Sequence, residues 1–381
     1  MEHKKLGDIA TYINGYAFKP QDRGEKGLPI IRIQDLTGNA YDVGFYDGDY
    51  PERIEINDGD ILISWSASLG VYIWDKGKAL LNQHIFKVVF DKIKVDKRYF
   101  VFAVQYKLKE MELKTHGATM KHIVKKDFDN TLIPFPSIKD QIEIANIISK
   151  ASEIISLRQE QLEKLEELIR ARFVELFGDV KINQHNYKKI KIKQVLKSCE
   201  AGWSGNGTQR VKKDDEIAVL KVSAVTKGYF IPEECKVLDD QENIKKYVTP
   251  EKGDLLFSRA NTREMVGATA IVREDYPTLI LPDKLWKIRF NDSANVFYMK
   301  YVLSSKSIRN EFSASSTGTS GSMFNVSMDK FKEIEIPIAP IELQNQFADF
   351  VQAIDKSKDS VQKALDEAQL LFDSLMQQYF G

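Results

Sequence analysis

The fold is decided by a stretch that occurs twice, Pro134-Phe-Pro-Ser-Ile-Lys-Asp-Gln141-Ile-Glu-Ile144-Ala145 and Pro337-Ile-Ala-Pro-Ile-Glu-Leu-Gln344-Asn-Gln-Phe347-Ala348. The two stretches align at a fixed offset (344 − 141 = 203). The same offset relates Phe128 to Phe331 and Phe177 to Phe380. An offset held over about fifty residues indicates a tandem duplication, in which each unit is a variable, strand-rich segment followed by a helix.

Each stretch opens a long amphipathic helix, predicted over Ile138–Phe177 and Ile341–Phe380. Proline is excluded from a helix interior, so Pro134 and Pro136 lie before the first helix, and Gly178 is suited to end it. About 40 residues at about 1.5 Å each make a rod of about 60 Å. Apolar residues recur in coiled-coil steps of three and four, with breaks at Arg158 and Arg172. They are Ile144, Ile148, Ala151, Ile155, Leu162, Leu165, Ile169 and Leu176.

The second helix has a weaker seam of Phe347, Val351, Ile354, Val361, Leu365, Ala368, Phe372 and Tyr379. We expect the two helices to pair with each other as a shared spacer. The alternative is that each helix packs only against its own domain. The predicted organisation is a first domain at 1–137, a spacer helix at 138–178, a second domain at 179–340 and a second spacer helix at 341–381.

Each variable segment is predicted to be a compact mixed domain. In the first, strands are expected at Ile30–Ile33, Ile61–Ile63, Val71–Trp74 and Ile85–Phe90, from their β-branched and aromatic content. A turn is expected at Asp35–Gly38 and a helix at Arg98–Leu113. In the second, Gly253-Asp-Leu-Leu-Phe-Ser258 repeats Gly59-Asp-Ile-Leu-Ile-Ser64, and one helix is expected at Phe297–Arg309. The scaffold is shared while the loops differ, as expected if each copy reads a different target.

Composition is that of a water-soluble protein. The 381 residues include 55 basic and 55 acidic ones, a net charge of zero, which argues mildly against a nucleic-acid binder. The local distribution of charged residues determines the electrostatic field at a binding surface, however, and the second variable segment is richer in basic than in acidic residues. There is no apolar run long enough for a membrane span and no apolar leader, so we expect a cytoplasmic protein. Cys199 and Cys235 are predicted to remain reduced thiols.

These motifs resemble the specificity subunits of type I restriction-modification systems. The resemblance lies in the proline-gated helix entry, the Gly-Asp-[Ile/Leu]-Leu-[Ile/Phe]-Ser strands, and the loops Gly117-Ala-Thr-Met-Lys-His-Ile123 and Thr317-Gly-Thr-Ser-Gly-Ser-Met-Phe-Asn-Val326. It covers the whole chain. The chain departs from strict repetition where Ser137 stands against Pro340, and where Gln83-His84 stands against Asp283-Lys284.

The resemblance implies two α/β target recognition domains, with the helices forming an antiparallel coiled coil that docks modification subunits. The implied partners are double-stranded DNA, two modification (methyltransferase) subunits and restriction (translocase/nuclease) subunits, with no membrane. The implied function is recognition of an asymmetric bipartite DNA target for adenine-N6 methylation and restriction. Two alternatives are a coiled-coil scaffold or adaptor that binds no DNA, and an orphan subunit that serves methylation alone.

Motifs for catalysis are not found in the sequence. There is no Asn/Asp-Pro-Pro-aromatic loop, no Walker-type phosphate loop, and no metal spacing among the five histidines. Gly202–Thr208 is glycine-rich but lacks Gly-x-Gly-x-x-Gly spacing, which favours an ordinary loop. Pro282-Asp283 lacks the rest of a nuclease core, which favours a turn. We therefore expect a non-catalytic chain without a metal or cofactor of its own, with methyl donor and ATP on its partners.

Base reading needs Arg, Lys, Asn, Gln, Ser or Thr on loops that enter a groove. For any single residue an ordinary solvated loop position is the simpler interpretation, and Trp65 and Trp203 are alternatively local core. As a set, their place in repeated loops on a rigid scaffold favours recognition. The predicted DNA-binding residues are Ser64, Trp65, Ser66, Asn82, Gln83, Lys114, Thr119, Lys121 and His122 in the first copy, and Trp203, Asn206, Thr208, Arg259, Asn261, Arg263, Thr317, Thr319 and Ser320 in the second.

Overall fold

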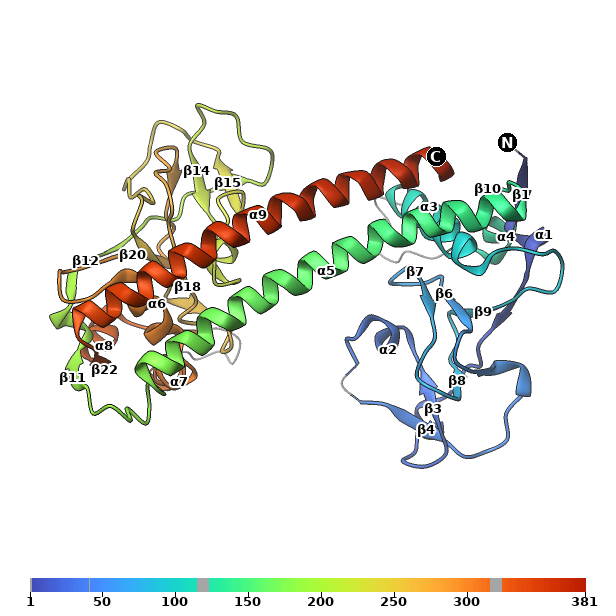
Figure 1. Ribbon diagram of the computed structural model, residues 1–381, viewed down its shortest axis with the longest axis horizontal. Coiled ribbons are helices and arrows are strands. Elements are labelled where there is room, and N and C mark those ends of the chain that lie inside the picture. Colours follow the sequence, from blue (N-terminus) through green and yellow to red (C-terminus); the bar gives the residue numbers. More distant parts are fainter. Residues whose placement is uncertain (1, 41, 115–122, 316–323) are drawn as a thin grey trace. The chain divides into compact units, whose positions relative to one another are not determined.

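The computed structural model describes residues 2–40, 42–114, 123–315 and 324–381. The chain forms two compact units, Met1–Gln159 with Gln362–Gly381 (unit 1), and Glu160–Val361 (unit 2). The long helix α5 (Ile138–Phe177) begins in unit 1 and ends in unit 2, whereas α9 (Ile341–Phe380) begins in unit 2 and ends in unit 1 (Figure 1). Both begin just after the prolines, as the sequence predicts.

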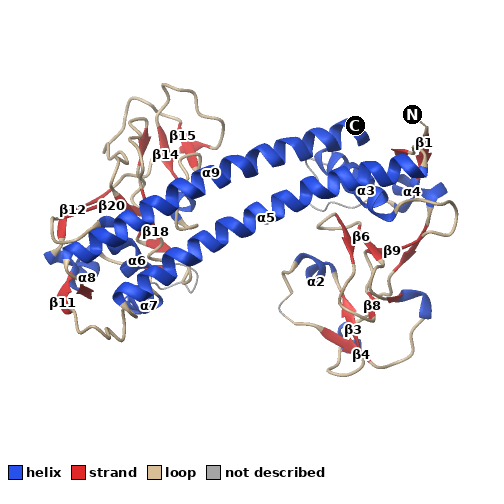
Figure 2. Cartoon of the chain, viewed as in Figure 1, coloured by secondary structure: helices blue, strands red, loops and turns tan. Residues whose placement is uncertain are grey.

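Unit 1 contains two four-stranded sheets and a two-stranded ribbon (Figure 2). One sheet is antiparallel, with the order β2 (Thr11–Asn14), β9 (Ile85–Val89), β6 (Ile61–Ser64), β7 (Gly70–Ile73). The other has the order β4 (Gly44–Tyr46), β3 (Leu28–Ile31), β8 (Ala79–Leu81), β5 (Glu55–Ile56), and its β3–β8 pair is parallel. The ribbon joins β1 (His3–Lys5) to β10 (Leu132–Pro134).

The core of unit 1 lies between its antiparallel sheet and its helices. The shorter helices are α1 (Leu6–Ile9), α2 (Ile33–Thr37), α3 (Lys97–Lys114) and α4 (Lys125–Asp129), with 3₁₀ turns at Pro20–Asp22 and Glu52–Ile54. Ile144 and Ile148 at the start of α5, and Met376 and Phe380 at the end of α9, belong to the same buried cluster. The core of this unit therefore includes one end of each long helix.

Unit 2 repeats this plan. Its antiparallel sheet has the order β12 (Leu196–Ala201), β20 (Leu285–Phe290), β16 (Leu255–Ser258), β18 (Thr269–Ile271). A second sheet has the order β13 (Gly207–Thr208), β15 (Cys235–Leu238), β14 (Ala218–Leu220), β19 (Leu279–Ile280), and β14–β19 is parallel. Two ribbons pair β11 (Lys188–Lys191) with β22 (Glu335–Ile338), and β17 (Ala260–Asn261) with β21 (Phe324–Asn325).

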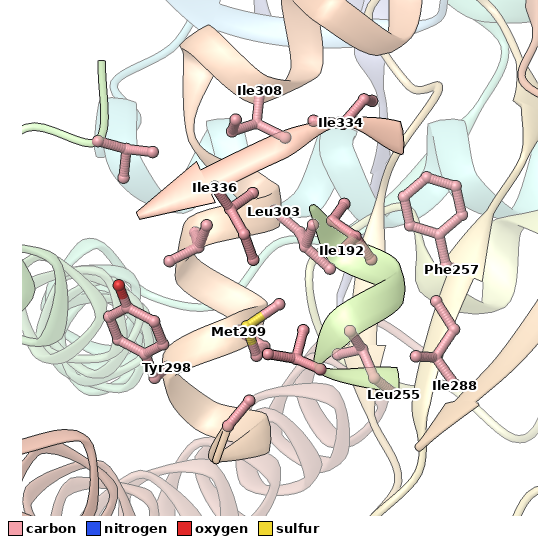
Figure 3. Packing of buried hydrophobic residues seen from close by; sticks show 14 of the residues in the cluster. Ile192, Leu255, Phe257, Ile288, Tyr298, Met299, Leu303, Ile308, Ile334 and Ile336 are labelled. Carbon is pink, nitrogen blue, oxygen red and sulfur yellow. The ribbon is translucent and has the colours of Figure 1, made fainter. Parts of the chain in front are cut away.

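The helices of unit 2 cover the buried face of its antiparallel sheet. They are α6 (Val296–Ser304), α7 (Lys306–Ser315) and α8 (Met328–Glu333), with 3₁₀ turns at Ile192–Gln194 and Val222–Val225. Figure 3 shows Met299 and Leu303 of α6 on the side of the strand residues Leu255 and Ile288, whereas Tyr298 points the other way, and its ring contacts Phe173 and Phe177 of α5. Burying such side chains, at about 25 cal/mol per Å² of apolar surface, supplies most of the stability of the unit.

The two long helices run antiparallel where they contact each other within unit 2. Glu166 of α5 binds Lys358 of α9, and further along α5 the rings of Phe173 and Phe177 contact Phe347. Residue numbers rise along one helix as they fall along the other, which is antiparallel packing. The predicted seam positions of α5 are buried or half-buried, whereas Phe173 and Phe177 are buried outside that seam.

Two local predictions are wrong. The strand expected at Ile30–Ile33 ends at Ile31, and the expected turn after it is the short helix α2, because Asp35 Oδ2 accepts a hydrogen bond from Arg32 N (2.8 Å) and caps it. The single helix expected at Phe297–Arg309 is two helices, because Ser305 takes an extended conformation (φ −61°, ψ 144°) between them.

The repeated Gly-Asp motif has a structural explanation in both units. Gly59 and Gly253 adopt positive φ (85° and 88°), which favours glycine. The next residue, Asp60 or Asp254, accepts a backbone hydrogen bond that closes the turn and binds a lysine of the neighbouring strand, Lys87 Nζ at 3.0 Å or Lys287 Nζ at 3.2 Å. The motif therefore fixes the register between adjacent strands.

Candidate nucleic-acid interface

In unit 1 the loops at one end of the antiparallel sheet come together. Because neighbouring strands alternate in direction, the carboxyl ends of β2 and β6 lie beside the amino ends of β9 and β7. Trp65 N donates a hydrogen bond to His84 O (3.2 Å), and Gln83 N donates one to Tyr16 O (2.9 Å). The predicted residues Ser64, Trp65, Ser66, Asn82 and Gln83 are thus gathered at this end of the sheet.

These five side chains have different surroundings. Ser64 is fully buried and donates to Ser68 O, which holds the loop, and Ser66 is buried as well, at 8% exposed. Trp65 is half-buried, stacks on Phe86 (ring centroids 5.5 Å apart) and binds Asn14 Oδ1 through Nε1 at 3.3 Å. Asn82 accepts a hydrogen bond from Gln83 N, whereas the Gln83 side chain is exposed. Gln83 is therefore the one exposed side chain among these five residues.

The same loops carry local backbone strain. Ala67 and His84 have positive φ angles of 59° and 71°, which residues with a Cβ rarely adopt. His84 Nδ1 is buried and has no hydrogen-bond partner among the residues that the structure describes. Strained backbone and unsatisfied polar atoms are concentrated at functional sites. Their position here marks the loop end of the sheet as the candidate site of unit 1.

Unit 2 gathers its loops at the corresponding end. Trp203 N donates to Leu281 O (2.8 Å), and Arg259 N donates to Lys284 O (3.0 Å). Asn261 lies on β17, which pairs with β21, the strand that begins at Phe324. The predicted residues Trp203, Arg259 and Asn261 are therefore held around one loop cluster.

Several predicted side chains of unit 2 already have protein partners. Arg259 binds Asp283 through Nη2 (3.2 Å to Oδ2) and Nε (2.8 Å to the backbone oxygen). Thr208 Oγ1 donates to Asp239 (2.8 Å), and Trp203 packs against the cluster formed by Val219, Leu238 and Ile280. Asn206 and Arg263 are exposed. Thr208 is exposed as well, so these three are the exposed members of the predicted set among the described residues of unit 2.

Some predicted residues lie beyond what the structure describes. Lys114 is the last residue of α3. Thr119, Lys121 and His122, and likewise Thr317, Thr319 and Ser320, lie outside the described residues. The chain becomes described again beside the loop clusters, since Ile123 N donates to Trp65 O (3.0 Å) and Val326 N donates to Arg259 O (2.9 Å).

Other residues at these loop ends were not predicted. They are Asn14, Tyr16 and His84 in unit 1, and Ser204, Lys246, Asp283 and Lys284 in unit 2. The sequence signal that could have indicated Tyr16 is the glycine before it, because Gly15-Tyr16 and Gly202-Trp203 follow equivalent strands. A Cβ on these glycines would lie 2.0 Å from Asn82 O and 1.8 Å from Leu281 O, so only glycine fits.

Positive charge is available at the loop end of unit 2. Lys246 donates to Ala201 O at the end of β12, Lys284 lies in the turn before β20, and Arg263 is exposed. Arg210 is different, because it makes two hydrogen bonds to Glu216 (2.7 and 2.6 Å) and lowers the pKa of that carboxyl to about 2. Its charge is already matched, whereas unpaired lysine and arginine attract the phosphate backbone of DNA.

Other kinds of site were sought in the described parts of the chain. No three His, Cys, Asp or Glu residues gather there as metal ligands would. Within the same residues, no helix combines the length and apolar character needed to cross a membrane. Cys199 and Cys235 are free thiols, and burial raises the pKa of Cys199 to about 11, which keeps that thiol protonated.

Two copies of one α/β scaffold, each presenting variable loops and each rooted on a long helix, define a tandem recognition protein. The family described as "Type I restriction modification DNA specificity domain" matches residues 1–167 and 184–369. The chain belongs to this family, and both copies of the domain are present.

Curated relatives agree with this assignment. The chain is 23% identical over 383 residues to the MjaVIII specificity subunit of Methanocaldococcus jannaschii, covering 94% of this chain and 89% of the relative. It is 24% identical over 410 residues to the EcoKI specificity subunit of Escherichia coli (strain K12), covering 98% and 86%. A shorter match to the EcoBI specificity subunit of Escherichia coli is 28% identical over 168 residues, 43% of this chain and 35% of that relative.

Solved structures share the fold. A type I restriction-modification S subunit from M. genitalium aligns with a TM-score of 0.57 at 15% identity, over 100% of this chain and 96% of that chain. A chain from a structure of type I restriction-modification complex assembly aligns with a TM-score of 0.52, also at 15% identity, over 99% and 97%.

Proposed function

We propose that this chain is the DNA-reading subunit of a type I restriction-modification complex, and that unit 1 and unit 2 each read one half of an asymmetric bipartite target. In this proposal the antiparallel long helices separate the half-sites by an unread gap of about one helical turn, near 34 Å. The chain selects the DNA sequence, while the partners hold the methyl donor and ATP and carry out base flipping, methylation and cleavage.

One observation carries the proposal: equivalent sheet ends carry different side chains, which are partly or fully accessible to solvent. The turn before β9 has Gln83-His84, and the equivalent turn before β20 has Asp283-Lys284. The first loop residue after the Gly-Asp strand is Trp65 in unit 1 and Arg259 in unit 2. Two domains that recognise different DNA sequences require a shared scaffold with different residues in the loops.

The helices supply candidate docking surfaces for modification subunits. In unit 1, α5 and α9 expose large apolar residues, namely Ile142, Ile147, Ile154 and Leu157 on α5 and Leu370 and Leu371 on α9. In unit 2, α5 exposes Leu168 (48%) and Val174 (56%). Clustered exposed apolar residues are typical of protein–protein contacts. We propose one modification subunit on each unit, with restriction subunits joining that assembly.

The experiment is a methylation map of DNA from cells that express this chain with its modification subunit, compared with cells lacking this chain. The expected result is a bipartite, asymmetric methyladenine motif that disappears without the chain. Exchanging residues 179–340 for the same segment of a relative should change one half-site only. Identical maps with and without the chain would overturn the proposal in favour of a scaffold that does not bind DNA.

A further inference from the structure

A buried glutamine fastens the start of α5 to the globular part of unit 1. Gln141 is 1% exposed. Its Nε2 donates to Pro136 O (2.9 Å), and its Oε1 accepts from Asp96 N (3.0 Å). Asp96 in turn caps α3 by accepting from Tyr99 N (3.0 Å), and the buried Tyr99 hydroxyl donates to Pro134 O (2.8 Å). One polar network therefore joins α5, α3 and β10.

Unit 2 contains the same network at the start of α9. Gln344 is fully buried; its Nε2 donates to Ala339 O (2.7 Å), and its Oε1 accepts from Asn295 N (2.8 Å). Asn295 caps α6 by accepting from Phe297 N (2.9 Å). The Tyr298 hydroxyl, labelled in Figure 3, donates to Pro337 O (2.9 Å). The glutamine and tyrosine bonds of the two networks correspond although their surroundings have diverged, and Gln344 Nε2 makes one more hydrogen bond, to Ser293 O (3.2 Å).

Apolar packing alone would hold these helices without fixing their direction. Hydrophobic contact is non-directional, so a helix can roll or tilt on an apolar surface at little cost. Hydrogen bonds require aligned donors and acceptors, and they are electrostatically stronger in a buried site. A glutamine bonded to two different chain segments therefore permits one orientation of the helix on its domain.

We propose that Gln141 with Tyr99, and Gln344 with Tyr298, are positioning residues that set the direction in which each recognition domain holds its long helix. Under the function proposed above, on which this inference rests, they thereby fix the length of the unread gap between the half-sites. They do not contribute to the reading of bases.

The length of the helix makes its direction important. A rod of about 60 Å that tilts by about 5° at its root moves its far end by about 5 Å. That displacement exceeds the rise of one base pair, about 3.4 Å. A small loosening at the root is therefore sufficient to change which gap length fits.

The test uses the complex of the full chain with its modification subunits. The mapped target is prepared with its natural gap and with gaps one base pair shorter and longer. Tyr99→Phe removes one hydroxyl, and Gln141→Met removes the amide at similar volume. The matched control is Tyr12→Phe, because Tyr12 is also buried and donates to Leu6 O (2.9 Å), but within the globular part of unit 1. Thermal melting checks that each variant folds.

We expect the preference for the natural gap over the altered gaps, measured as a ratio of methylation rates, to fall about threefold to tenfold in Tyr99→Phe and Gln141→Met. Discrimination at the half-site bases should stay unchanged. Tyr12→Phe should keep the wild-type ratio. Should Gln141→Met not fold, Tyr99→Phe decides the matter.

Two results would overturn the inference: an unchanged gap preference in the folded variants, or an equal loss of preference in Tyr12→Phe, which would indicate a general effect on stability. Failure of the underlying function looks different. In that case the unaltered complex would methylate no bipartite target, and this would be seen before any variant is made.

Discussion

Replacing Asp254 by alanine should destabilise unit 2 more than any comparable change at the equivalent site in unit 1. Asp254 is fully buried, at the centre of an ion network. Its carboxylate lies 3.2 Å from Lys287 Nζ and 2.6 Å from Arg289 Nε, and it accepts a hydrogen bond from Glu251 N (2.7 Å). The substitution removes all three interactions together.

The loss of stability depends on the charged side chains that remain after Asp254 is removed. The Lys287 side chain is 8% exposed, so its ammonium cannot move into water. Removing one partner of a buried ion pair costs about 3–5 kcal/mol. Lys287 keeps Glu251 Oε1 at 2.7 Å and Thr249 O at 2.9 Å, which reduces the loss, so we expect about 3 kcal/mol. That is a large part of the roughly 5–15 kcal/mol that stabilises a domain.

Urea unfolding of the full chain measures this effect. Trp203 and Trp286 report on unit 2 by fluorescence, while hydrogen exchange shows which unit opens. The matched control is Asp60→Ala in unit 1, where the side chains of Asp60 and Lys87 are 26% and 18% exposed. Partial exposure predicts a smaller loss there, about 1–2 kcal/mol. A loss below about 1 kcal/mol for Asp254→Ala, or equal losses at both sites, would refute this reasoning.

Three further predictions concern recognition, pH and geometry. Arg263→Ala should weaken DNA binding at the half-site read by unit 2 by about 1–3 kcal/mol, measured by fluorescence anisotropy. Arg273→Ala, at the opposite end of the same sheet, should leave binding unchanged, and equal effects of the two substitutions would contradict the proposed position of the DNA-binding site. Burial pushes the pKa of Glu166 up, but the hydrogen bond from Lys358 and nearby positive charge leave it lowered. The ionised Glu166 therefore stabilises the fold above the pKa of the unfolded state, about 4.5, and this stabilisation is lost as pH falls through the lower pKa of the folded state. Glu166→Gln should thus reduce the loss of unit 2 stability at acidic pH, and an unchanged dependence of stability on pH would contradict this. Inserting four residues, about 6 Å of helix, into each long helix should lengthen the unread gap by one or two base pairs and leave both half-sites unchanged, as measured in a methylation map. Altered half-site bases would show that base reading and spacing are not separate functions of the chain.

The sequence by itself determined the repeat, the starts of both long helices and most strands of the antiparallel sheets. These features depend on local rules: proline excludes the helix before Ile138, glycine closes the turn before β6, and periodicity marks the buried positions. The loop ends that carry the predicted DNA-binding residues also followed from the repeat, because equivalent loops leave equivalent strands.

The tertiary structure alone decided which of those residues are accessible and what holds each helix. Ser64 is a loop residue by sequence, yet its hydroxyl is buried, and Arg259 is tied to Asp283, which lies 24 positions away in the turn before β20. Phe173 and Phe347, far apart in sequence, contact each other inside one unit. The physical reason is that burial and hydrogen-bond partners are set by pairings distant in the chain, whereas composition and periodicity report only on neighbours.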